Sequence, residues 1–124
     1  MKRILVLVAS LVPFLASAAV PEDTPEGVQR FRNLYKELVE TNTTLSAGSC
    51  TLAAERMAAR LRAAGLPESD LHLYAAPDHP KEGGLVAVYP GRDAAAKAIL
   101  LMAHIDVVEA KRVDWTRDPF NLVE

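Results

Sequence analysis

The sequence predicts an incomplete α/β fold on three observations. Two segments with helical periodicity are followed by three strand-like segments, and half of the 124 residues are hydrophobic, enough for one core. The third strand-like segment, residues 98–103, is apolar throughout, as in strands that are covered on both faces of an α/β sheet. Two helices and three strands do not close such a layered structure. We therefore expect the chain to be the front part of a longer protein.

Capping residues and apolar periodicity predict the two helices. Thr24 and Pro25 are typical of a helix start, and this helix is expected to end near Thr41. Its apolar face comprises Val28, Phe31, Tyr35, Leu38 and Val39. A polar loop, residues 42–49, leads to a second helix that Gly65 ends as a left-handed C-terminal cap. The narrow apolar face of this second helix, which suits a close approach to a sheet, comprises Ala54, Met57, Ala58 and Leu61.

Three strand-like segments follow, at residues 71–75, 85–89 and 98–103. Residues 77–84 join the first two, and this connection is too short for a parallel crossover, so we expect an antiparallel hairpin. The third segment lacks alternation and is expected to lie in the middle of the sheet. His72 in the first strand and His79 in the connecting loop are expected to face solvent.

The first residues have the features of an export signal. Residues 1–3 are a basic start, residues 4–16 are mostly apolar, and residues 16–18 have the small-x-small pattern that signal peptidase cuts. The apolar run is shorter than the roughly 20 residues of a permanent membrane span. We therefore expect residues 1–18 to be a signal peptide and residues 19–124 to be a secreted or periplasmic chain. An uncleaved anchor is the alternative.

Charge and cysteine content argue against two classes of function. The 14 basic and 16 acidic residues give a formal net charge of −2, and no basic block favours nucleic acid or an anionic membrane as a partner. Cys50 is the only cysteine, so no disulfide can form within one chain. No histidine lies near Cys50 in the sequence to act as its base. Cys50 is therefore expected to be a small, partly buried residue and not a nucleophile.

His104 and Asp106 follow directly on the apolar segment 98–103. In extended backbone, residues two apart point to the same side, so both side chains are expected together at the C-terminal end of the strand. That edge is where open α/β sheets bind ligands. A neutral imidazole is a zinc ligand, and a neighbouring carboxylate can fix its tautomer. The residues alone also allow a plain hydrogen bond at a strand end, and they do not complete a zinc site.

Two motifs in order, AHIDVV at residues 103–108 and WTRDPF at residues 115–120, resemble a known family. This is the zinc exopeptidase family of carboxypeptidases, aminoacylases, dipeptidases and desuccinylases. The two helices, the loop between them and the hairpin also fit, so the resemblance covers residues 25–124. It implies an α/β fold that is the N-terminal part of a mixed-sheet zinc-exopeptidase (phosphorylase/hydrolase-like) catalytic domain. Ala103 departs from the glycine of many family members.

The resemblance implies an exported hydrolase of small peptides or N-acyl amino acids that binds two zinc ions. His104 would ligate one zinc ion, and Asp106 would be the catalytic aspartate that holds and polarises this histidine. The family's other ligands, its general base and its second domain, which often mediates homodimerisation, have no counterpart in this sequence, so the chain alone is expected to be inactive. The alternative is a non-catalytic exported α/β module or an inactive remnant, in which the two residues form only a hydrogen bond.

We predict that export removes the leader, because residues 1–18 combine a basic start, an apolar run and a cleavage pattern. Intact-mass analysis of the secreted protein should show a chain that starts at Ala19 or one residue later. A mature protein that still carries Met1 would contradict the prediction.

Overall fold

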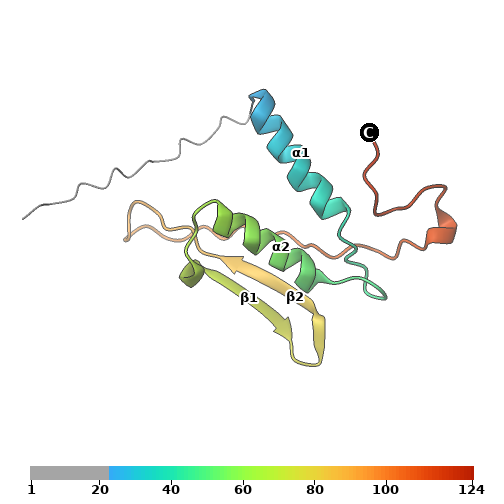
Figure 1. Ribbon diagram of the computed structural model, residues 1–124. Helices are drawn as coiled ribbons and strands as arrows, with labels where there is room; N and C mark the ends of the chain where they lie inside the picture. Colours follow the sequence, from blue (N-terminus) through green and yellow to red (C-terminus); the bar gives the residue numbers. More distant parts are fainter. Residues whose placement is uncertain (1–22) are drawn as a thin grey trace, which may run out of the picture.

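The structure, a computed structural model, describes residues 23–124 and contains two helices packed with a two-stranded antiparallel sheet. The elements in chain order are α1 (Pro25–Val39), α2 (Cys50–Ala63), η1 (Glu68–Asp70), β1 (Leu71–Ala76), β2 (His79–Ala87) and η2 (Arg112–Asp114). Figure 1 shows α2 running alongside the hairpin of β1 and β2, with α1 to one side. The predicted α/β class is confirmed as a small mixed structure of two helices and one two-stranded sheet. The expected signal peptide, residues 1–18, lies outside the described residues.

Helix α1 begins where its capping residues predict and ends at Val39, two residues before Thr41. The Thr24 hydroxyl accepts a hydrogen bond from the Gly27 amide at 3.1 Å, and Pro25 opens the first turn. The expected apolar face exists, but no residue of α1 is buried and Phe31 is 65% exposed. Within residues 23–124, no helix or strand covers this face. In that part of the chain no helix has the length and apolar character to cross a membrane.

Helix α2 has both of its ends fixed by local hydrogen bonds. At its start, the Ser49 hydroxyl accepts from the Leu52 amide at 3.1 Å. At its end, Gly65 has a φ of +96°, and the Leu66 amide donates to the Leu61 carbonyl at 3.0 Å. This pattern is a Schellman motif, so the predicted left-handed cap at Gly65 is confirmed.

The core lies between α2 and the hairpin. Its buried apolar side chains are Ala53, Ala54, Ala58 and Leu71. The first turn of α2 lies close to Gly83 of β2, where a Cβ atom would overlap the Thr51 side chain and the Tyr74 carbonyl oxygen. The Thr51 hydroxyl also donates to the Pro80 carbonyl at 2.7 Å, which joins the first turn of α2 to β2. Small residues on both sides therefore set the distance between helix and sheet.

The hairpin is antiparallel, as predicted, but its turn is shorter than expected. Ala76 pairs with His79, which leaves Pro77 and Asp78 as a two-residue turn in place of the predicted loop 77–84. The sequence-based loop was wrong because strand pairing continues almost to the tip. Register shifts between Ala75 and Ala76, so residues 80–82 bulge out of the ladder of β2. His79 is thus the first residue of β2, although it is exposed, as expected.

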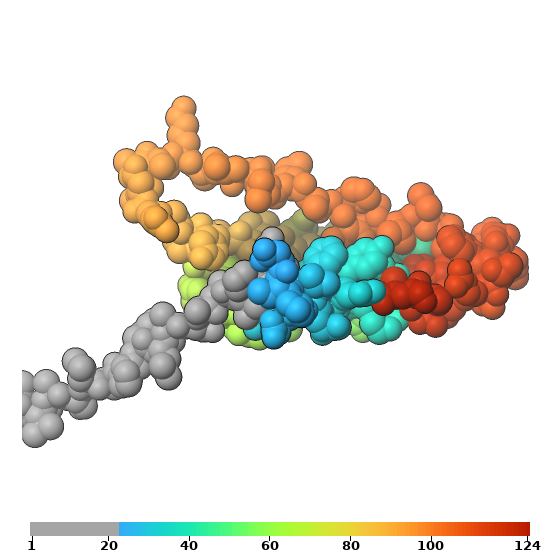
Figure 2. Space-filling model, turned by 90° about the horizontal axis from the view of Figure 1, so that it is seen from above, coloured from blue at the N-terminus to red at the C-terminus, as the bar shows by residue number. Residues whose placement is uncertain are grey.

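The predicted third strand, residues 98–103, is not formed. Ile99, Leu100, Leu101 and Met102 are 77–89% exposed, and the described sheet has only β1 and β2. Figure 2 shows residues 90–103 standing away from the helices and hairpin as an extended arm. The prediction was wrong because an apolar segment forms a strand only where it can pair with another strand and pack against a covering layer. The exposed run is a surface of the kind that promotes association.

We predict that Ala58→Leu destabilises the fold, because Ala58 is fully buried between α2 and the hairpin. Overpacking of this kind costs about 1–3 kcal/mol in the free energy of unfolding. Ala59→Leu, the same change on the exposed face of α2, is the matched control and should stay within about 0.5 kcal/mol. Urea unfolding followed by circular dichroism measures both. Equal effects of the two substitutions would show that α2 does not pack as described.

Candidate functional site

The His104 and Asp106 side chains contact each other. His104 Nδ1 lies 3.3 Å from Asp106 Oδ1 and 3.0 Å from the Asp106 carbonyl oxygen. The predicted placement of both side chains on one side of the chain is therefore confirmed. The pair is not at a sheet edge, because the strand expected before it is absent, and the two side chains are 84% and 71% exposed.

The contact of His104 Nδ1 with two oxygens favours one tautomer of the imidazole. Only a protonated Nδ1 can donate to the Asp106 oxygens, so the neutral ring carries its proton there and its lone pair on Nε2. An Nε2 lone pair can bind a metal ion, and a carboxylate on the opposite nitrogen increases the basicity of the ligand. The pair has the chemistry of one metal ligand with its orienting group.

The segment that carries the pair is attached to the loop between α1 and α2. The Thr43 hydroxyl donates to the Ile105 carbonyl at 2.7 Å, and the Val107 amide donates to the Thr43 carbonyl at 3.5 Å. Farther along, the Ser46 amide and hydroxyl donate to the two oxygens of the Glu109 carboxylate at 2.9 and 2.6 Å. These Ser46 hydrogen bonds lower the pKa of the Glu109 carboxyl from its ordinary value.

The loop is itself held by buried hydroxyl groups. Thr41, Thr43 and Thr44 are all buried, although they are polar. The Thr41 hydroxyl donates to the Glu37 carbonyl at 2.6 Å, and the Thr44 hydroxyl bonds the Asn42 side chain at 2.8 Å. Each buried hydroxyl has a partner, which is the condition for burying such groups without a large cost.

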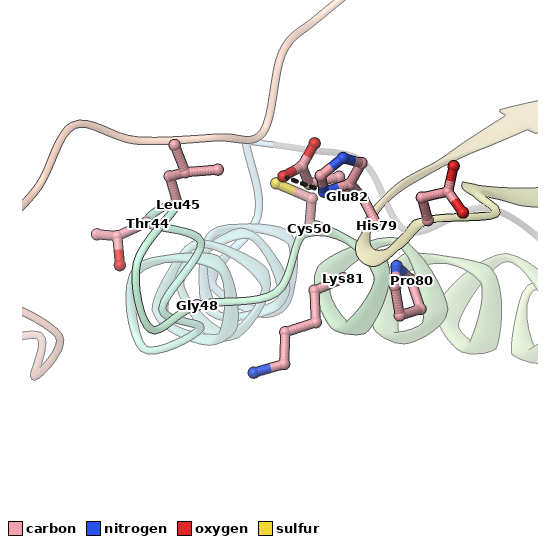
Figure 3. Close-up of a pocket in the computed structure, with 9 residues that line it drawn as sticks. Thr44, Leu45, Gly48, Cys50, His79, Pro80, Lys81 and Glu82 are labelled. Atoms are coloured by element: carbon pink, nitrogen blue, oxygen red, sulfur yellow. Dashed lines mark ion pairs between the residues drawn. The ribbon is translucent and has the colours of Figure 1, made fainter.

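A cavity of about 320 Å³ opens between this loop, the start of α2 and the hairpin tip. It is lined by Thr44, Leu45, Gly48, Cys50, Asp78, His79, Pro80, Lys81 and Glu82. His79 Nδ1 lies 3.6 Å from Glu82 Oε1, across the bulge in β2. Figure 3 shows the Cys50 sulfur on the same side as this ion pair, with Lys81 directed away from it.

Cys50 is half-buried, as expected, and its surroundings keep it protonated. Burial raises the pKa of the Cys50 thiol above its ordinary value, and the negative charges of Asp106 and Glu82 raise it further. A raised pKa lowers the fraction of thiolate, which is the nucleophilic form of cysteine. Thr43 links the His104–Asp106 pair to the cavity, because its carbonyl lies 3.9 Å from the Cys50 sulfur and its hydroxyl donates to Ile105, between His104 and Asp106.

The donor atoms present fit one metal–imidazole bond and not a complete zinc site. Within residues 23–124, no group of three or more histidine, cysteine, aspartate or glutamate side chains could hold a metal ion. Catalytic zinc takes at least three protein ligands. His104 thus offers one donor atom, Nε2, and His72 and His79 are exposed on the hairpin.

Comparisons with known proteins add no relative to this description: no family model, curated protein or solved structure matches the chain. The hydrogen bond of Thr43 to Ile105 was missed by sequence reasoning, because the two residues lie 62 positions apart. The placement of His79 beside Cys50 was missed for the same reason. Neither has a local signal beyond the polar character of the loop and the hairpin tip.

We predict that Asp106→Asn lowers the pKa of the Cys50 thiol, because it removes a negative charge that disfavours the thiolate. The rate of alkylation by iodoacetamide, measured against pH, should reach its midpoint at lower pH in the variant. Asp93→Asn, near the start of the arm, is the control and should leave the midpoint unchanged. An unchanged midpoint in Asp106→Asn would place Asp106 away from the thiol.

Proposed function

We propose that the chain is the N-terminal part of an exported zinc-dependent hydrolase that cleaves peptide or N-acyl amide bonds. The observation that carries the proposal is the contact of His104 Nδ1 with Asp106, which leaves Nε2 to bind a metal ion. The AHIDVV and WTRDPF motifs support it through their resemblance to the zinc exopeptidases. We propose that the complete protein has the larger mixed sheet of that family and a site for two zinc ions.

In this proposal, His104 binds one zinc ion through Nε2 and Asp106 holds the proton on Nδ1. The carboxylate keeps the ring in the metal-binding tautomer and increases the electron density at Nε2. Zinc, when bound, supplies a Lewis acid for the carbonyl group of the substrate. The other ligands and the general base come from outside residues 23–124, because the described residues offer no group of three donors.

The proposal is tested by titrating the mature chain, residues 19–124, with zinc and following the imidazole signals of its three histidines by NMR. We expect the His104 signals to shift at lower zinc concentration than those of His72, which is exposed on β1, and of His79, whose Nδ1 lies farther from its carboxylate partner, Glu82, at 3.6 Å. Asp106→Asn should move the His104 response to higher zinc concentration. In a complete site, the loss of such a partner costs about 10–100-fold in affinity.

A second measurement separates binding from catalysis. The zinc-loaded chain should hydrolyse neither dipeptides nor N-acyl amino acids above a metal-only blank, because residues 23–124 bring together no three side chains that could hold a catalytic zinc ion. If all three histidines respond at the same zinc concentration, the pair is an ordinary hydrogen bond. The chain is then better described as a non-catalytic exported α/β module.

A further inference from the structure

We propose that Thr43 is a positioning residue that fixes the direction of the His104 imidazole. This inference rests on the proposed function, because direction matters only if Nε2 binds a ligand. Thr43 touches neither the imidazole nor a metal ion; it acts through the backbone between His104 and Val107.

The two side chains of the pair have little packing to hold them. His104 and Asp106 are largely exposed, whereas Ile105 between them is half-buried. The Ile105 carbonyl accepts the Thr43 hydroxyl at 2.7 Å, the shortest contact between this segment and Thr43. Because packing does not orient the pair, its direction depends on how the backbone beneath it is held.

The peptide group between Asp106 and Val107 links Thr43 to the imidazole. Its N–H, on Val107, donates to the Thr43 carbonyl at 3.5 Å, and its C=O, on Asp106, accepts from His104 Nδ1 at 3.0 Å. In a trans peptide the N–H and C=O point in opposite directions. The Thr43 hydroxyl, by holding the Ile105 carbonyl, keeps this peptide group beside the Thr43 carbonyl, which then binds the N–H and directs the C=O towards His104 Nδ1.

Thr43 is suited to this role because it is fixed itself. It is 5% exposed and sits in a loop that the Ser49 amide closes by donating to the Asn42 carbonyl at 2.9 Å. The Thr43 carbonyl also lies 3.9 Å from the Cys50 sulfur, at the start of α2. The Ser46–Glu109 hydrogen bonds attach the same loop to the segment at a second point.

The test compares Thr43→Val, which removes only the hydroxyl donor, with Thr43→Ser, which retains it. Thr44→Val is the matched control, because Thr44 is equally buried in the same loop but its hydroxyl bonds only Asn42. In the metal-free mature chain, backbone NMR order parameters of residues 104–109 should fall from about 0.85 to below about 0.6 in Thr43→Val. Thr43→Ser and Thr44→Val should keep the wild-type values, and circular dichroism should show that α2 is retained in all three.

The second readout is the zinc titration of the His104 signals. Thr43→Val should raise the zinc concentration at half-saturation about two- to tenfold, the range expected for one neutral hydrogen bond, and Thr43→Ser should restore it. Unchanged order parameters in Thr43→Val, or an equal loss in Thr44→Val, would overturn the positioning role whether or not zinc binds. A wild-type His104 that does not respond to zinc overturns the proposed function, and this result needs no variant.

Discussion

Helix α2 packs closely on the hairpin because the buried side chains on its contact face, Ala53, Ala54 and Ala58, are small. The rest of the structure depends on this close approach. Gly83 allows the same closeness from the side of the sheet. With α2 in this position, its first residue, Cys50, faces the hairpin tip and the cavity forms between them. The loop that precedes α2 is fixed at its end by the same packing, and this loop holds the segment of His104 and Asp106.

The candidate site is therefore built on irregular backbone and not on a sheet. It is held by the hydroxyl and the carbonyl of Thr43 and by Ser46, which donates to the Glu109 carboxylate. Hydrogen bonds of this kind fix direction better than apolar packing does, because they require aligned donors and acceptors. The site is correspondingly open, since both members of the His104–Asp106 pair are mostly exposed. An open ligand of this kind suits a metal site that other residues complete.

Local signals in the sequence predicted local structure well. Thr24 caps α1, Gly65 ends α2, and the short connection between β1 and β2 required antiparallel strands. The contact of His104 with Asp106 was also predictable, because side chains two residues apart can lie on the same side of the chain. The exposed arm was not predictable. Hydrophobicity indicates that residues 98–103 favour a buried strand, but it does not indicate whether a neighbouring strand is present to pair with them. Thr43 was missed because its contact crosses 62 residues, for which a single sequence carries no signal.

The attachment of α1 has a consequence for how this protein responds to its solution. Arg60 of α2 pairs with Glu37 and donates to the Asn33 carbonyl, while Arg32 pairs with Glu124 near the end of the chain. Charge, and not a buried apolar face, therefore sets the direction of α1. The screening length falls from about 8 Å at physiological ionic strength to about 3 Å in 1 M salt. We therefore expect the angle between α1 and α2 to vary with ionic strength, whereas the apolar packing of α2 on the hairpin is not screened by salt.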